Sequence, residues 1–558
     1  MRKCLFILLF LGVALPLVAQ ETVVERVWVT TAKTVYLAGE RVHCSAFCLD
    51  AGGGFSSLSR VAYLELHSAE GLAATAKVAL DGGRGGGYLD LPASLPTGNY
   101  RLIAYTAQNK NEVDLDFSQL PARTLSVFNT RTTARVKGGV EVVSAADYKQ
   151  RMMEQVIMPG SDALVMPGSD RASQIKLSYA DGTLILTNET TGPMTLCLSV
   201  YRADDILSPA EPSLAAFLED LRRTGPRRFE DRVLPDCEGE VLQARITGVE
   251  PDRLLDWLGR IVFLSTPSDQ AEVYVAPVAA DGRLAFLTGN IYGRRELICQ
   301  AEGAALPAGA RIEILSPYLN VDVPAPEALV LSEAIAPALE AHAARLQAEH
   351  PLLDTLSDYL PRREFLLLDD APVVYPLDDY TRFNTLEETF VEFISQVRVR
   401  QDRNGAPLIQ VRLEDIVDNP AFSNEPALLL LDGVPVFDHA KMLRYDPRLL
   451  KTIEVYPRTY YLAGRAYPGV VQFNTQKRNL TSFKLDDGVQ VIDFQGISWP
   501  TIWMGDSFWH PLVDLAPGLT RQFSGILPVA PGRYVIHVEG LAVDGRQPIS
   551  TTLVVDRW

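Results

Sequence analysis

The 558-residue chain carries 52 Lys and Arg against 69 Asp and Glu, a formal net charge of −17, and 47% of its residues are hydrophobic. An acidic chain without a basic block is a poor partner for nucleic acid, because phosphate contacts need clustered Lys and Arg. The same charge provides no attraction to an anionic membrane surface. At about 150 residues per domain, the length predicts three or four domains, or more if they are small sandwiches.

Residues 1–20 are typical of a secretory signal peptide. Arg2 and Lys3 precede an apolar run that is too short to span a bilayer, and small residues follow it before Glu21. Cys4 stands before this run, whereas a lipid-modified cysteine would follow it, so we expect no lipid anchor. No later stretch reaches the roughly 18 apolar residues of a spanning helix. We therefore predict an exported chain without a transmembrane segment, whose 50 basic and 69 acidic residues give a net charge of −19.

Five cysteines remain after residue 20, and their odd, scattered count does not predict a disulfide framework. They are Cys44, Cys48, Cys197, Cys237 and Cys299. Cys44 and Cys48 lie on one expected strand, roughly 13 Å apart at about 3.3 Å per residue, which is too far for a bond between them. At most two bridges can form, and we expect buried thiols that act as small apolar residues.

Residues 21–128 predict an all-β sandwich, because short apolar or alternating runs are separated by Gly-rich turns. The expected strands are 27–29, 41–49, 62–67, 76–80 and 100–106. Residues 35–42 and 95–106 resemble the entry strand and a late strand of macroglobulin-type sandwich domains, although Ala38 stands where that family usually has Pro.

Residues 129–236 predict a second β-sandwich with a connector, and residues 237–322 a third sandwich. The expected strands are 174–178, 183–187, 194–201, 240–246, 260–264, 272–278, 284–287, 296–300 and 311–315, with a short helix at 213–221. A repeated Met-Pro-Gly-Ser-Asp at 158–162 and 166–170 indicates a duplicated loop. The third unit is similar to carboxypeptidase-regulatory-like and macroglobulin-like sandwiches.

Residues 323–361 predict a helical connector, since 331–347 is rich in Ala and Leu at helical spacing and bends or restarts around Pro337. Residues 362–480 predict a small α/β body. Thr385 and Glu388 have the spacing of a capping box before an apolar helix face. Its strands are expected at 409–413, 427–431, 452–455 and 470–474.

Residues 427–476 of this α/β body resemble the plug domain of TonB-dependent outer-membrane receptors. In that family the turns are structural, and here they correspond to Asp432, Gly433, Gly464 and Gly469, where glycine adopts backbone conformations that a Cβ resists. Eight membrane strands would use roughly 80 residues before any turn. The residues after 476 therefore do not predict a barrel. The resemblance implies a Gram-negative bacterium and an outer-membrane context.

Residues 481–558 predict a C-terminal β-sandwich. Residues 532–540, together with Asp544 and Gly545, resemble late strands of macroglobulin core sandwiches, although the usual Trp before an Asn-Pro is absent near Pro511. The fold class is thus mainly β and multi-domain: several macroglobulin- or Ig-like sandwiches, a helical connector and one plug-like α/β domain.

No residue set predicts catalysis, a cofactor or a metal. The macroglobulin thioester needs Cys-x-Glu-Gln, but the string at 237–240 lacks the Gln, so Cys237 is expected to start a strand. Ser507 follows Gly505-Asp506 without a suitably spaced base. His342 and His350 could share a helix face, but zinc needs three or four ligands, and we expect both to be exposed.

Acidic pairs at 369–370 and 378–379 surround a Tyr-Pro step. Such pairs can bind calcium or serve as acid and base, but in a Pro-containing loop they more often cap turns. We therefore assign them no ligand.

The candidate contact residues for a partner or ligand are aromatic. Trp499, Trp503, Phe508 and Trp509 are clustered in the sequence, and Tyr460 and Tyr461 form a weaker pair. Exposed rings of this kind anchor partners or stack on sugars. The alternative is that the cluster fills a seam between the plug-like body and the last sandwich.

These patterns predict an exported, non-enzymatic binding or scaffold protein of the bacterial cell envelope, in the periplasm or associated with the outer membrane. Its partners would be envelope proteins, including an outer-membrane barrel protein. Two alternatives are an accessory of TonB-linked nutrient import and a macroglobulin-like protease trap without the thioester.

Overall fold

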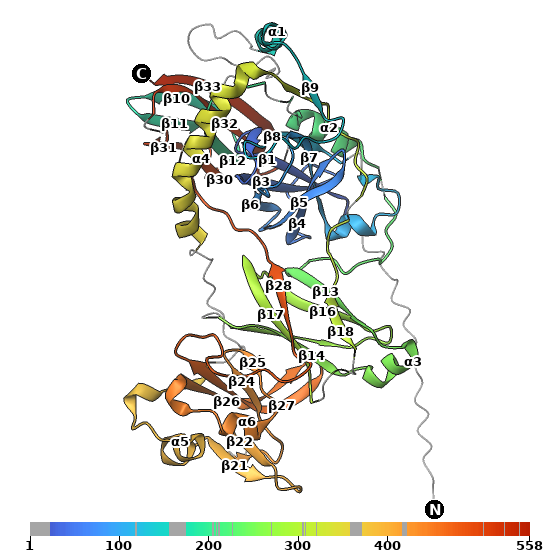
Figure 1. The fold of residues 1–558 in the computed structure, drawn as a ribbon, viewed down its shortest axis with the longest axis vertical. Helices are drawn as coiled ribbons and strands as arrows, with labels where there is room; N and C mark the ends of the chain where they lie inside the picture. The colour runs from blue at the N-terminus through green and yellow to red at the C-terminus, as the bar shows by residue number, and fades with distance from the viewer. Residues whose placement is uncertain are drawn as a thin grey trace, which may run out of the picture.

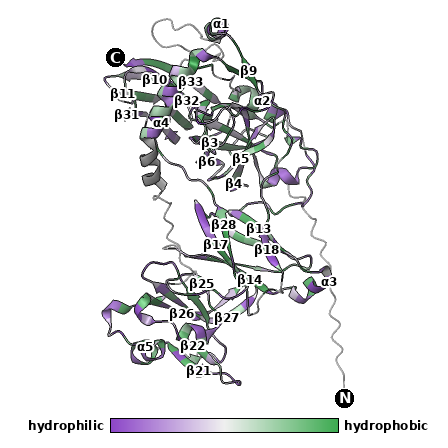
Figure 2. Cartoon of the chain, viewed as in Figure 1, coloured by the Kyte–Doolittle hydropathy of each residue, from purple (hydrophilic) through white to green (hydrophobic). Residues whose placement is uncertain are grey.

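A computed structural model describes residues 23–557 except 118–119, 156–174, 204–205, 208, 210–211, 226, 269–270, 304–305, 307–308, 320, 358–370, 416–420, 506, 529 and 546. The predicted signal peptide, the duplicated loop and Asp369 and Asp370 lie outside these residues. The protein is mainly β and has several domains (Figure 1). Hydrophobic residues lie mainly in the strands (Figure 2). In the described part of the chain, no helix is long and apolar enough to cross a membrane.

The first sandwich packs two sheets around an apolar core that includes Val42, Leu64 and Leu125. One sheet has the order β1 (Glu25–Thr31), β3 (Arg41–Asp50), β6 (Arg84–Asp90). The other has the order β2 (Val35–Leu37), β8 (Ala122–Phe128), β7 (Gly98–Thr106), β4 (Val61–Ser68), β5 (Gly71–Ala79). A 3-10 turn, η1 (Ala107–Asn111), follows β7.

The second sandwich is built from two distant parts of the chain. Its small sheet has the order β10 (Ile175–Ala180), β11 (Thr183–Asn188), β31 (Thr520–Ser524). Its large sheet has the order β29 (Trp503–Met504), β30 (Phe508–Leu515), β12 (Met194–Arg202), β32 (Gly532–Ala542), β33 (Pro548–Arg557).

This pairing corrects the separate sandwiches predicted at 129–236 and 481–558. β12 pairs on one side with β30 and on the other with β32, and both pairings are antiparallel. Leu196 and Leu198 of β12 share one core with Val538 of β32. The three strands of the earlier segment therefore bury their apolar face only when the C-terminal strands join them.

The third sandwich also takes a strand from the C-terminal part of the chain. One sheet has the order β16 (Arg283–Gly289), β13 (Glu240–Thr247), β18 (Arg311–Ile314). The other has the order β15 (Glu272–Pro277), β14 (Ile261–Thr266), β17 (Arg294–Ala301), β28 (Gln490–Gln495). A helical turn, α3 (Pro251–Leu254) with η3 (Leu255–Trp257), caps one end. β28 thus belongs to this sandwich and not to the predicted C-terminal one.

The α/β body contains a five-stranded and a three-stranded sheet. The first has the order β20 (Val373–Pro376), β26 (Leu450–Leu462), β27 (Arg465–Thr475), β24 (Leu428–Leu431), β25 (Val434–Pro435). The second has the order β21 (Val397–Gln401), β22 (Pro407–Leu413), β23 (Ala421–Phe422). The helical elements are η5 (Leu377–Asp379), α5 (Leu386–Phe393), α6 (His439–Leu443) and η6 (Pro447–Leu449). Thr385 caps α5 by accepting the amide hydrogen of Glu388.

The remaining elements connect the domains. They are β9 (Val140–Val142), α1 (Ala145–Gln155), α2 (Leu214–Arg223), β19 (Leu329–Leu331), η4 (Glu333–Ile335) and α4 (Ala336–Ser357). β19 pairs in parallel with β9. Through Leu339 and Ala343, α4 packs against the apolar cluster that contains Leu37 of β2 and Phe128 of β8. In the view of Figure 1 it crosses in front of the second sandwich.

The chain path is nested. After β12 the chain leaves the second sandwich and builds the third, and after β18 it passes through α4 into the α/β body. It returns to the third sandwich through β28 and then completes the second with β29 to β33 (Figure 1). The α/β body is therefore an insertion in the third sandwich, which is itself an insertion in the second.

The five cysteines after residue 22 are all unbonded thiols. Cys44, Cys48, Cys197 and Cys299 are buried, and burial raises the pKa of Cys44 to about 12. Cys237 differs from the expectation: it is exposed and precedes β13 instead of starting it.

Candidate functional site

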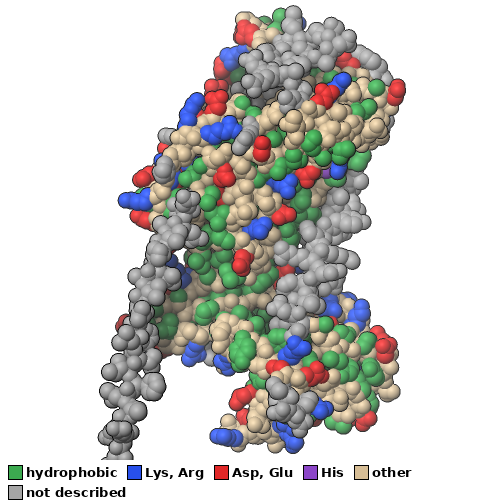
Figure 3. Space-filling model, turned by 180° about the vertical axis from the view of Figure 1, so that it is seen from behind, with side chains coloured by type: hydrophobic (Ala, Val, Ile, Leu, Met, Phe, Trp, Pro, Cys, Tyr) green, Lys and Arg blue, Asp and Glu red, His purple; other side chains and the backbone are tan. Residues whose placement is uncertain are grey.

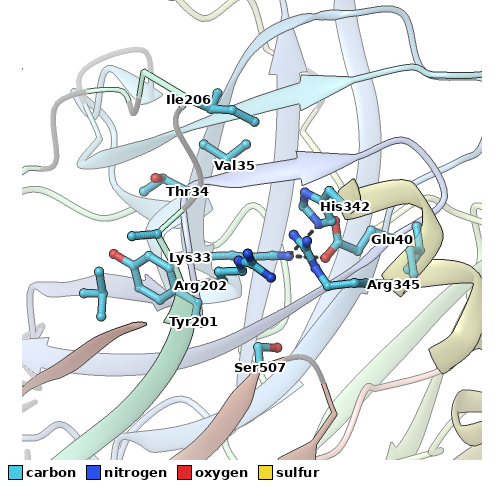
Figure 4. A pocket seen from close by; sticks show the side chains of 13 residues that line it. Lys33, Thr34, Val35, Glu40, Tyr201, Arg202, Ile206, His342, Arg345 and Ser507 are labelled. Atoms are coloured by element: carbon cyan, nitrogen blue, oxygen red, sulfur yellow. Dashed lines mark hydrogen bonds and ion pairs between the residues drawn. The ribbon is translucent and has the colours of Figure 1, made fainter. Parts of the chain in front are cut away.

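A cavity of about 160 Å³ lies where the first sandwich, the second sandwich and α4 meet (Figure 4). The segment around β2 contributes Lys33 and Glu40, the end of β12 contributes Arg202, and α4 contributes His342 and Arg345. The other lining residues are Thr34, Val35, Tyr201, Ala203, Ile206, Leu346, Ser507 and Val535. The cavity thus depends on three parts of the chain that only the tertiary fold brings together.

Lys33, Glu40 and His342 form a polar network on one wall of the cavity. The Lys33 ammonium contacts Glu40 Oε1 and lies 3.2 Å from His342 Nε2, which is 3.3 Å from Glu40 Oε2. Glu40 also accepts a hydrogen bond from the Leu37 amide at 2.8 Å. Burial alone would raise the pKa of Glu40, but Lys33 and His342 lower it to about 2, so this carboxylate is charged and internally paired.

Two guanidinium groups enter the same cavity, one from the end of β12 and one from α4. Arg202 and Arg345 point into its centre beside Lys33 (Figure 4). Arg202 is partly buried, and among the described residues its guanidinium has no hydrogen-bond or ion-pair partner. Asp204, Asp205 and Asp506 adjoin lining residues in sequence but lie outside the described residues. The described lining therefore carries more positive than negative charge.

Ser507 and His342 both line the cavity, but they do not form a nucleophile–base pair. Ser507 lies apart from His342 in the cavity (Figure 4), and no hydrogen bond joins them. His342 is buried, not exposed as we expected, because it packs over the Lys33–Glu40 pair. Asp378 pairs with Arg382. Among the described residues, no group of three His, Cys, Asp or Glu side chains could hold a metal ion.

The predicted aromatic contacts are mostly buried. Trp503 stacks on His43 with ring centroids 5.6 Å apart, and Trp499 meets the edge of Tyr88 at 5.3 Å. Trp509 joins Trp503 in a cluster with Ala32 and Cys197, and Phe508 lies in the core of the second sandwich.

This burial corrects two expectations about the cluster. Trp499, Trp503, Phe508 and Trp509 do not present rings to a partner in this arrangement. The seam that Trp499 and Trp503 fill lies against the first sandwich, not against the α/β body, because β29 and β30 return beside β12. Tyr461 is 73% exposed, whereas Tyr460 packs on Tyr456 toward the third sandwich.

Asp432 and Gly433 form the tight turn between β24 and β25, with φ angles of 49° and 85°. The Asp432 carboxylate is buried and accepts hydrogen bonds from the amide and hydroxyl of Thr475, both at 2.7 Å, and from the Leu480 amide at 2.8 Å. A Cβ on Gly433 would lie 2.6 Å from the Cβ of Ala271, so this turn also touches the third sandwich.

The other two predicted turn glycines differ from each other. Gly464, with φ of 80°, lies in the turn between β26 and β27. Gly469, with φ of 88°, lies inside β27, where the register with β26 shifts between Tyr456 and Thr459. It therefore accommodates a bulge and not a turn, because an extra residue on the partner strand kinks the ladder.

His439 supports the α/β body as a buried neutral side chain. Its Nδ1 accepts the Ile409 amide hydrogen at 2.9 Å, and burial lowers its pKa to about 4. Because the folded-state pKa is below the ordinary 6.5, the stabilisation is complete above pH 6.5 and is lost as the pH falls toward 4.

We therefore expect the free energy of opening of β22 to fall by about 2–3 kcal/mol between pH 6.5 and 4. Hydrogen exchange of peptides from 407–413 measures this change. In His439→Gln the amide oxygen can still accept from Ile409 without titrating, so the pH dependence should flatten. An equally steep dependence in this variant would contradict the assignment.

Comparisons with known proteins give no family assignment. No family model matches the chain, and no curated protein sequence matches it. Among solved structures, native α-2-macroglobulin of Escherichia coli has 10% identity and a TM-score of 0.24 over 95% of this chain and 40% of that protein. A point mutant of Salmonella α-2-macroglobulin has 9% identity and a TM-score of 0.24 over 96% of this chain and 39% of that protein. The Escherichia coli adhesin FdeC has 13% identity and a TM-score of 0.15 over 53% of this chain and 65% of that protein.

The chain spans less than half of the length of these two macroglobulins. TM-scores of this size do not establish a shared fold. The class of the protein follows instead from its own strand pairing: it is a multi-domain, mainly β protein with nested sandwiches and an inserted α/β body.

Proposed function

We propose that this chain is an exported, non-enzymatic binding or scaffold protein of the bacterial cell envelope, and that its α/β body recognises a partner protein. The observation that carries this proposal is the way the inserted body is anchored. One face of its five-stranded sheet packs on the third sandwich, where Leu428, Leu430 and Tyr467 meet Ile261 and Phe263. A body held in this way can be presented in a fixed orientation.

Polar contacts support the same docking. Gln300 donates to the Pro435 carbonyl at 2.7 Å, and Tyr467 donates to Glu302 at 3.0 Å. Arg465 pairs with Glu302 at 2.8 Å. The contacts combine apolar burial with charge-assisted bonds, which favours a single relative orientation of the two domains.

The part of the body away from this interface exposes apolar side chains. Val374, Tyr380 and Val391 are exposed, and Val391 on α5 is 82% exposed. Figure 3 shows hydrophobic side chains on the surface of the α/β body, in the lower part of the view. The plug resemblance of 427–476 and the signal-like residues 1–20 support an envelope partner.

Photo-crosslinking in intact cells tests the proposal without deleting a domain. A crosslinking amino acid at position 391 should attach to one specific envelope protein. The matched control is position 287, because Leu287 of the third sandwich is 67% exposed and lies outside the α/β body. Absence of an adduct from 391, or the same adducts from both positions, would contradict the proposal.

The identity of the attached protein also separates the alternatives. An outer-membrane barrel protein would favour an accessory role in TonB-linked import. A protease captured during cleavage would favour a trap.

A further inference from the structure

We infer that the cavity between the first sandwich, the second sandwich and α4 binds the carboxylate of a small organic acid. The first reason is the state of Arg202. This guanidinium is partly buried, lines the cavity and has no hydrogen-bond or ion-pair partner among the described residues. A partly desolvated guanidinium without an anion lacks the partner that usually compensates its burial.

The second reason is the balance of charge around Arg202. Lys33 and Glu40 compensate each other, so this pair leaves no negative charge to balance the guanidinium of Arg202. A planar guanidinium donates two parallel N–H groups, which match the two oxygens of a carboxylate. The positive lining occurs in a chain with net charge −17, so it is a local feature and not a consequence of overall composition.

The third reason is the rest of the wall and its size. Val35, Ile206, Leu346 and Val535 supply an apolar surface beside the cations. The volume of about 160 Å³ is similar to the engineered cavity of roughly 150 Å³ that holds benzene. Free phosphate would leave the apolar wall without a contact. A short-chain carboxylate can contact both the cationic side chains and the apolar wall. Benzene fills the comparison cavity with roughly six carbons, so we expect an acid of about four to six carbons.

The site is reachable by solvent. Lys33 and Glu40 retain 16% and 11% of their side-chain exposure. The ligand would contact α4 and both sandwiches at once, so its binding would also hold α4 against them.

Isothermal titration calorimetry of the full chain at pH 7 and low salt tests the inference. Butyrate, valerate and hexanoate are the probes, and butyramide, butylamine and inorganic phosphate are the comparison solutes. We expect saturable binding of at least one carboxylate and at least tenfold weaker binding of the amide and the amine. Arg202→Gln should weaken carboxylate binding at least tenfold, because a charge-assisted pair is lost. The control Arg403→Gln, in the turn between β21 and β22, should bind as the wild type does.

Four results would overturn the inference: no saturable carboxylate binding, equal affinity for the amide, binding of phosphate alone, or unchanged affinity in Arg202→Gln. Since Arg202 has no internal partner, this variant should keep the wild-type melting temperature. If it does not, Arg202→Lys decides the question. Weaker carboxylate binding in a folded Arg202→Lys supports the inference, because Lys cannot form the paired bonds, and full affinity overturns it.

Discussion

Lys77→Met should weaken the contact between the first and third sandwiches by about 3–5 kcal/mol, one of the two largest effects we expect. Lys77 of β5 donates to Glu240 at the start of β13 across 2.5 Å, and the two side chains are only 2% and 3% exposed. Methionine retains the apolar stem but not the charge. The Glu240 carboxylate would then remain buried in the domain contact without its cation.

Urea unfolding followed by tryptophan fluorescence should show the first transition at lower urea. The chain has several domains, so the transitions are compared one by one and not as a single two-state process. Arg223→Met is the matched control, because Arg223 is exposed on α2 and its ion pairs lie in solvent. This control should leave the transitions unchanged.

A double variant separates the loss of attraction from the cost of an unpaired charge. In Lys77→Met with Glu240→Gln, no buried charge remains, so much of the lost stability should return. A double variant as unstable as the sum of the two single variants would contradict this explanation.

The sequence predicts strands much better than it predicts their partners. The apolar run at 194–201 indicates β12, since alternation and β-branched residues are local properties. The partners of β12 are β30 and β32, which lie more than 300 residues later and show no local sign of the pairing. Two halves of one sandwich were therefore interpreted as two sandwiches.

β6 shows why a strand can be missed entirely. Its run of glycines resembles a turn, because glycine weakens a strand. In the structure, a Cβ on Gly86 would lie 2.6 Å from Pro511, and one on Gly87 would lie 2.3 Å from Ser498 Oγ. These glycines permit the close approach of a segment that is distant in sequence, which no local pattern reveals.

The candidate site was missed for the same reason. Lys33, Arg202 and Arg345 come from three separate segments, and none belongs to a motif. The tryptophan cluster was visible in the sequence, but the surface that covers it was not. Local composition thus indicates which residues are unusual, whereas burial and partners follow from long-range packing.

Gly469→Ala should destabilise the α/β body by about 2–5 kcal/mol, whereas Gly464→Ala should cost about 1–2 kcal/mol. Both glycines have left-handed φ angles, 88° and 80°, so both substitutions carry a similar backbone strain. A Cβ at 469 would lie 2.4 Å from Val411 Cβ, but a Cβ at 464 has nothing within 4 Å. The difference between the two variants therefore measures crowding between β27 and β22.

Hydrogen exchange of peptides from β22 and β27 in the full chain measures this difference. Val411→Gly removes the Cβ and both methyl groups of Val411, which lie 2.4, 2.8 and 2.9 Å from a Cβ built at 469. In the double variant with Gly469→Ala the two costs should therefore be less than additive. Equal losses of protection in Gly469→Ala and Gly464→Ala would show that backbone conformation alone explains both glycines. A larger loss in Gly469→Ala, relieved by Val411→Gly, would show that the two sheets of the α/β body pack too closely for a Cβ at 469, opposite the bulge in β26.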